Sequence, residues 1–74
     1  MNENSIEKRR LQLGEAIRAF RKKEKLSQET LATMVGTKPN AIYRVEHGIT
    51  NTGINMIMKI ADALNVETKD LIDF

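Results

Sequence analysis

The 74-residue sequence has no cysteine, one proline and three aromatic residues, and each scarcity restricts what the chain can be. Without cysteine it forms no disulfide, no thiolate zinc site and no thiol nucleophile, as is typical of a protein in a reducing compartment. No apolar run approaches the roughly 20 residues of a membrane-spanning helix, and residues 1–6 lack the apolar stretch of a signal peptide. We therefore expect a cytoplasmic protein, without a membrane partner, whose core is built from aliphatic side chains.

A chain of this length forms a single domain, taken as residues 1–74, which buries only about 60% of its surface. It has one histidine and no glycine-rich phosphate loop, so no short motif supplies a metal cluster or a nucleotide site. Any acid–base pair would be exposed and untuned, and we expect no enzyme. For the same reasons we expect no cofactor, no metal ion and no small-molecule ligand.

The charges are unevenly distributed, although the net charge is only +2. Residues 1–44 hold ten Lys/Arg against five Asp/Glu, whereas residues 45–74 hold two against five. A polyanionic partner would therefore meet the first part of the chain and not the second. The same distribution is also compatible with helix faces that are simply solvated.

Hydrophobic residues recur at spacings of three and four, the period of α-helices, and predict five helices. Within residues 6–24, Leu13, Ile17 and Phe20 form one face of the first helix. The cationic residues expected off this face are Arg18, Arg21 and Lys22. Residues 1–10 form either a helical extension or a frayed tail. The cations there that could reach a phosphate, or be merely solvated, are Lys8, Arg9 and Arg10.

Capping residues set the limits of the second helix. Ser27 is a good N-cap, although the capping box is incomplete because Thr30 stands where Glu or Gln is needed. Gly36 ends the helix, since glycine readily adopts positive φ. The residues of this helix that are predicted to face the core are Leu31, Ala32 and Val35.

The third helix is predicted to begin at the only proline. Lys38 precedes it and must lie outside the helix, whereas Pro39 suits the first helical position, where its missing N–H costs nothing. The helix runs to about residue 47, and Gly48 closes it. At about 100° per residue its faces separate by polarity. The inward face holds Ala41, Ile42 and Val45, and the opposite face, which suits the major groove, holds Asn40, Tyr43, Arg44 and His47.

A polar loop, residues 49–53, leads to a fourth helix, and a short fifth helix covers about residues 68–72 with Leu71 in the core. The apolar stripe of the fourth helix is formed by Ile54, Ile57, Ile60, Ala61 and Leu64. Further apolar residues either fill the core, as methionine often does, or form a twofold dimer interface, which we expect. The candidates for that interface are Met56, Met58, Ile72 and Phe74.

Four segments, in this order and spacing, resemble the helix-turn-helix domains of phage repressors and Cro proteins, the Xre-like family. They are LSQETLA (26–32), VGT (35–37), IYRVEHG (42–48) and KIADALNV (59–66). The resemblance covers about residues 13–72. It implies an all-α fold, a compact five-helix bundle similar to the lambda-repressor-like DNA-binding domains, whose second motif helix enters the major groove.

Carried over by position, the resemblance implies that Lys38, Pro39, Asn40 and Arg44 read base edges. It also implies that Gln28 binds phosphate and braces the third helix. The loop residues that would touch the DNA backbone are Thr50, Asn51 and Thr52.

The sequence departs from the family pattern at three positions. Lys25 replaces a common glycine, Lys38 replaces a Ser or Thr cap, and Thr37 occupies a position that is often apolar.

The chemistry of these side chains leaves several roles open. Arg44 can bind guanine through two hydrogen bonds, but it can also contact phosphate or form an ion pair with Glu46 or another neighbour. Asn40 suits adenine in the same way, or can act as a local polar cap. Lys38 favours phosphate over guanine because its ammonium is a compact point charge, and the ring of Pro39 can pack on a thymine methyl.

Tyr43 and His47, both on the groove-facing side, can each bind phosphate.

Together these expectations describe a homodimeric transcriptional regulator that binds double-stranded DNA at a twofold-symmetric operator. Both a phage-type repressor and a restriction–modification controller fit this description, and the sequence favours neither activation nor repression. The alternative is an antitoxin or a protein-binding scaffold with the same fold.

Overall fold

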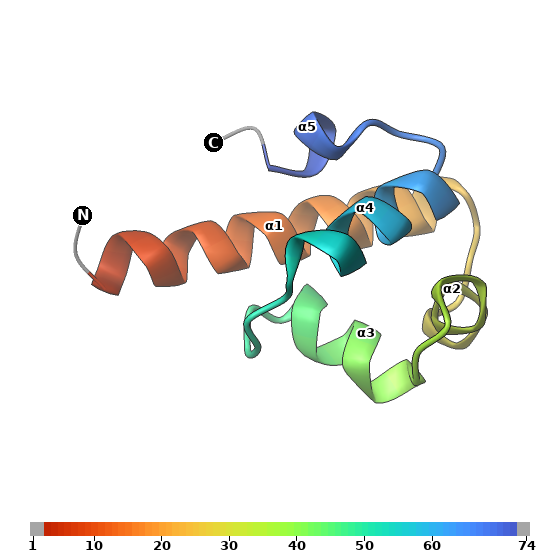
Figure 1. The fold of residues 1–74 in the computed structure, drawn as a ribbon, viewed down its shortest axis with the longest axis horizontal. Coiled ribbons are helices and arrows are strands. Elements are labelled where there is room, and N and C mark those ends of the chain that lie inside the picture. Colours follow the sequence, from red (N-terminus) through yellow and green to blue (C-terminus); the bar gives the residue numbers. More distant parts are fainter. Residues whose placement is uncertain (1–2, 73–74) are drawn as a thin grey trace.

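In the computed structural model, residues 3–72 are described, and they form five α-helices joined by short loops (Figure 1). The helices are α1 (Glu3–Lys23), α2 (Gln28–Val35), α3 (Pro39–Glu46), α4 (Ile54–Ala63) and α5 (Thr68–Leu71). No strand occurs between residues 3 and 72, and the predicted all-α fold is confirmed for this range. None of the described helices is long and apolar enough to cross a membrane.

The helices α2 and α3 begin and end close to where their capping residues predicted. The hydroxyl of Ser27 accepts a hydrogen bond from the backbone N–H of Thr30 at 3.0 Å, and Gly36 ends α2 with a φ of 76°. Lys38 is extended, with φ −100° and ψ 152°, and its side chain makes no capping bond. Pro39 is the first residue of α3, as predicted.

The turn between α1 and α2 has a backbone conformation that favours glycine, although a lysine stands there. Lys25 has a φ of 58°, in the left-handed region that costs a residue with a Cβ roughly 1–2 kcal/mol. The backbone N–H of Leu26 donates to the carbonyl oxygen of Arg21 at 3.0 Å across this turn. The turn is therefore kept although lysine replaces the common glycine, at the cost of local backbone strain at Lys25.

Aliphatic side chains from all five helices form one core. Its fully buried large members are Ile17, Leu31, Ile42, Ile60, Leu64 and Leu71. Ile54 belongs to the predicted apolar stripe of α4 but lies outside this core, because it is 55% exposed. Ile54 is the first residue of α4 and shares its outer side with Met58, four residues later, which is 48% exposed.

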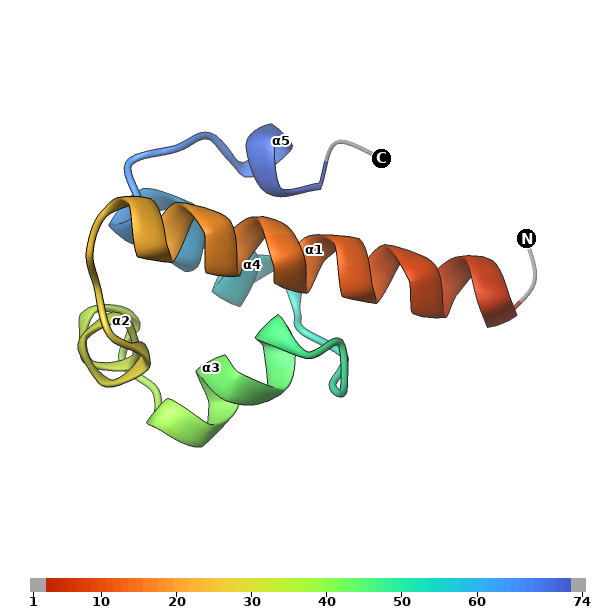
Figure 2. The same ribbon diagram turned by 180° about the vertical axis from the view of Figure 1, so that it is seen from behind.

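α1 runs the length of the molecule, and its first turns extend past the other helices (Figures 1 and 2). Its 21 residues make it about 31 Å long. Residues 3–10 are therefore part of the helix, and residues 1 and 2 of the predicted extension lie outside the described residues. Further along, α1 lies against α3 at the buried Gly14, where a Cβ would overlap the backbone carbonyl oxygens of Val45 and Glu46.

We expect Gly14→Ala to destabilise the fold, because α1 and α3 must move apart to admit one methyl group. A substitution that overpacks a core typically costs about 1–3 kcal/mol, and urea denaturation measures the change in the free energy of unfolding. Gly53→Ala is the matched control, since a Cβ there meets nothing within 4 Å. Equal stabilities of the two variants would show that the α1–α3 contact is not tight.

Candidate nucleic-acid interface

The outward side of α3 gathers most of the side chains that the sequence predicted to bind DNA. The exposed residues on it or at its ends are Lys38, Pro39, Asn40, Tyr43, Arg44 and His47. On the opposite side, Ile42, Val45 and Glu46 are only 1%, 4% and 5% exposed. The predicted division into a polar and a buried face is confirmed, except that the buried face also contains a carboxylate.

The exposed aromatic rings of Tyr43, on α3, and His47, directly after it, pack against each other. The rings of Tyr43 and His47 are stacked, with centroids 4.1 Å apart and an interplanar angle of 25°. Nδ1 of His47 lies 2.9 Å from the carbonyl oxygen of Tyr43. A carbonyl only accepts, so this contact requires the proton on Nδ1 and leaves Nε2 directed away from the helix backbone.

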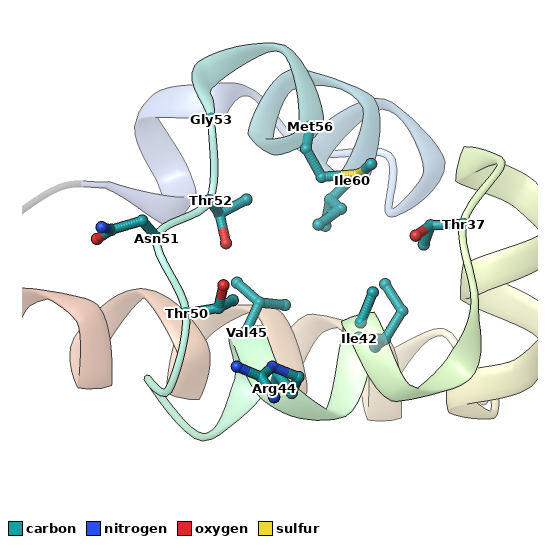
Figure 3. A pocket seen from close by; sticks show the side chains of 11 residues that line it. Thr37, Ile42, Arg44, Val45, Thr50, Asn51, Thr52, Gly53, Met56 and Ile60 are labelled. Atoms are coloured by element: carbon teal, nitrogen blue, oxygen red, sulfur yellow. The ribbon is translucent and has the colours of Figure 1, made fainter.

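A shallow hollow of about 250 Å³ lies between α3, the loop before α4, and α4 itself (Figure 3). Its lining includes Arg44 and the three predicted loop residues Thr50, Asn51 and Thr52. In Figure 3 the hydroxyl oxygens of Thr50 and Thr52 point into the hollow, whereas the Asn51 amide points away from it. The structure thus brings the loop residues beside Arg44, although they are 6–8 residues apart in the sequence.

The sequence interpretation missed a buried ion pair below this surface. Arg21, expected off the buried face of α1, is only 8% exposed. Its Nε and Nη2 donate to the Glu46 carboxylate at 2.6 and 3.1 Å. The spacing could have revealed both residues, because Arg21 follows Ile17 by four positions and Glu46 follows Ile42 by four, each continuing a buried helix face.

Two further hydrogen bonds connect this ion pair to α2. Nη1 of Arg21 donates to the carbonyl oxygen of Leu26 at 2.8 Å, and Nε2 of Gln28 donates to Oε1 of Glu46 at 3.1 Å. Gln28 thus connects α2 to the end of α3, as expected for a brace. No buried side-chain polar atom among the described residues lacks a hydrogen-bond partner.

The ion pair also removes one of the alternatives for Arg44. The Glu46 carboxylate is turned inward to Arg21, while Arg44 is exposed on the other side of α3. Neither this buried pair nor the exposed pair of Lys69 and Glu67 involves Arg44. The expectation that Arg44 could pair with Glu46 is therefore wrong, and its guanidinium is available to a ligand.

The basic residues near the start of α1 do not form one surface. Because this segment is helical, Lys8, Arg9 and Arg10 project about 100° apart around the axis. Arg10 is half-buried, whereas Lys8 and Arg9 are exposed. Their contact with phosphate therefore stays a prediction, and it is more plausible for the two exposed residues than for the half-buried Arg10.

The candidate dimer residues fall on different sides of the molecule. Met58 and Ile72 are 48% and 38% exposed, whereas Met56 is half-buried, packs against the core and lines the hollow beside α3. Two residues apart on a helix, Met56 and Met58 project about 200° from each other. Phe74 lies outside the described residues. The exposed Ile54, from the predicted apolar stripe of α4, is a better neighbour for Met58.

The family model described as helix-turn-helix matches residues 17–71, which includes α2, α3, the loop and α4. The chain belongs to this helix-turn-helix family. The match covers the predicted motif and ends at the last residue of α5.

Several relatives of this helix-turn-helix protein are similar over most of their length. It is 39% identical over 66 residues to the control protein C.BamHI of Bacillus amyloliquefaciens, covering 88% of this chain and 82% of that protein. The crystal structure of the restriction–modification controller protein C.AhdI from Aeromonas hydrophila superimposes with a TM-score of 0.81 at 35% identity, covering 84% of this chain and 94% of that one. A hypothetical transcription factor from Neisseria, NHTF, gives 0.83 at 33% identity, covering 86% and 74%.

We expect Arg21→Met to destabilise the helix-turn-helix domain by about 3–5 kcal/mol, because it leaves the Glu46 carboxylate buried without its counter-charge. Urea denaturation followed by circular dichroism measures the loss. The control is Lys69→Met, which breaks the Lys69–Glu67 pair, whose side chains are 79% and 73% exposed. That substitution should cost less than about 1 kcal/mol. Similar losses for the two variants would contradict the importance assigned to the buried pair.

Proposed function

We propose that this protein is a sequence-specific transcriptional regulator that binds double-stranded DNA, of the type of the restriction–modification controllers. The observation that carries the proposal is the exposed polar side of α3, whose opposite side packs into the core through Ile42 and Val45. A rigid helix that presents hydrogen-bonding side chains and a cation fits the major groove, where every base pair shows a distinct pattern of donors and acceptors. The two control proteins among its relatives support this choice. A DNA partner also agrees with the cytoplasmic location expected from the sequence.

Base reading is assigned to residues at the start and middle of α3. Arg44 is exposed, has no ion-pair partner among the described residues and can hold guanine through two hydrogen bonds. Asn40, on the same side, suits adenine. Lys38 and Pro39 lie at the N-terminus of α3, where Lys38 is assigned to a base or a phosphate and Pro39 to a thymine methyl.

Contacts to the DNA backbone are assigned to residues around this side of α3. Gln28 is the first residue of α2, an end that favours phosphate because of its unpaired N–H groups. The stacked Tyr43 and His47 offer a hydroxyl and a ring nitrogen. The remaining backbone contacts are assigned to Thr50, Asn51 and Thr52 in the loop beside Arg44.

The regulator is proposed to act as a homodimer. Ile54 and Met58 lie on α4 and Ile72 directly follows the adjoining α5, and all three are exposed. A twofold axis through this apolar surface would set two copies of α3 about 34 Å apart, one turn of duplex. The operator would then have twofold symmetry.

Selection of bound duplexes from a random pool tests the proposed function. The native protein should return a twofold-symmetric site, and Arg44→Ala should lose about 1–3 kcal/mol of preference at one position of each half-site. Lys69→Ala removes a cation from α5, far along the chain from α3, and should leave the preference unchanged. Equal weakening of Arg44→Ala on all sequences would assign this side chain to the backbone.

The salt dependence of the same binding separates DNA recognition from a protein-binding role. The logarithm of the association constant should fall with the logarithm of salt concentration, with a slope of about −0.9 for each phosphate neutralised. Failure to select any sequence, with weak binding that hardly responds to salt, would contradict the proposed function and favour a protein partner.

We expect Met58→Glu to shift the sedimentation equilibrium from dimer to monomer, because it introduces a charge into the proposed apolar interface. Operator affinity should fall with it. Met34→Glu is the matched control, since Met34 is 52% exposed on α2, outside that interface. A native protein that is monomeric at tens of micromolar would contradict the proposed dimer.

A further inference from the structure

Glu46 is buried, yet it contacts a side chain that is assigned to DNA binding. Its carboxylate is fully buried, and it holds Nε and Nη2 of Arg21 at 2.6 and 3.1 Å. The remaining donor comes from Gln28, whose Nε2 lies 3.1 Å from Oε1 of Glu46. Gln28 itself is half-buried at the start of α2, between this carboxylate and solvent.

This contact selects one orientation of the Gln28 amide. A carboxylate accepts hydrogen bonds but cannot donate, so only the NH₂ group of Gln28 fits against it. The reversed amide would place its carbonyl oxygen against a carboxylate oxygen and lose the hydrogen bond. In the selected orientation, one N–H of Nε2 is used inside the fold and the second remains for a partner outside.

We propose that Glu46 is a positioning residue for DNA binding, which fixes the Gln28 amide so that its outer N–H donates to a backbone phosphate. The inference rests on the proposed function, because that function supplies the phosphate. An amide that is ordered before binding loses less side-chain entropy in the complex. Arg21 supports the same arrangement from behind, since its Nη1 also holds the Leu26 carbonyl that precedes α2.

A thermodynamic cycle on operator binding tests the role of Glu46. The double variant Arg21→Met/Glu46→Leu removes the acceptor of Gln28 together with its counter-charge, a replacement that commonly preserves a fold. In the native background, Gln28→Ala should weaken binding about 5–10-fold per half-site, the worth of one hydrogen bond. In the double variant, Gln28→Ala should change the affinity less than about twofold, because the amide is no longer held. The slope against salt should stay constant, since glutamine carries no charge.

Equal losses from Gln28→Ala in both backgrounds would overturn the inference and leave the ion pair a purely structural role. No loss in the native background would also overturn it, because Gln28 would then make no contact worth positioning.

NMR relaxation of the glutamine side-chain amides in the free native protein gives a test that needs neither a variant nor DNA. Gln28 and the exposed Gln12 are the two glutamines of the sequence, so Gln12 is an internal control. The order parameter of the Gln28 amide should approach about 0.85, as in a rigid backbone, with Gln12 below about 0.6. A Gln28 amide as mobile as Gln12, in a protein that binds its operator, would overturn this inference alone. A rigid amide in a protein that binds no duplex would overturn the proposed function.

Discussion

The buried ion pair of Arg21 and Glu46 is the interaction on which the arrangement of the first three helices depends. Arg21 belongs to α1 and Glu46 ends α3, while the same guanidinium holds the Leu26 carbonyl before α2. Two charges taken out of water are tolerated only when each has its partner and its hydrogen bonds. The angle between the two motif helices and α1 is therefore set by polar geometry, in addition to the contact of aliphatic side chains.

The close passage of α1 along α3 makes this pair possible. Gly14 and Arg21 lie on the same side of α1, about two turns apart. Because Gly14 has no Cβ, the carbonyl groups of Val45 and Glu46 can lie directly against α1. One small residue and one ion pair thus provide two contacts between α1 and α3. Two contacts at separate points along a helix determine its direction relative to the other helix.

The sequence predicted the helices and the exposed side of α3 well, because both follow from local rules. The period of the apolar residues, the cap at Ser27 and the proline at position 39 each act within a few residues. The buried charges were missed for a different reason. The spacing places Arg21 and Glu46 on buried helix faces, but charged residue types are ordinarily assigned to solvent, and no local rule pairs residues 25 positions apart. The exposure of Ile54 was not predicted either, because the sequence shows the apolar stripe of α4 but only the packing of α4 decides which of its residues are covered.

The position of Glu46 also resolves a conflict of charge at the proposed DNA-binding surface. The acidic part of the sequence begins with this residue, two positions after Arg44, and an exposed carboxylate there would repel phosphate and compete for the guanidinium. Two residues on a helix point about 200° apart, so Glu46 turns inward when Arg44 turns outward. Because Arg21 then neutralises Glu46 inside the fold, the outer side of α3 keeps its cation and presents no carboxylate. The same pair that orders the helices therefore also leaves the side of α3 proposed to meet a polyanion without an exposed carboxylate.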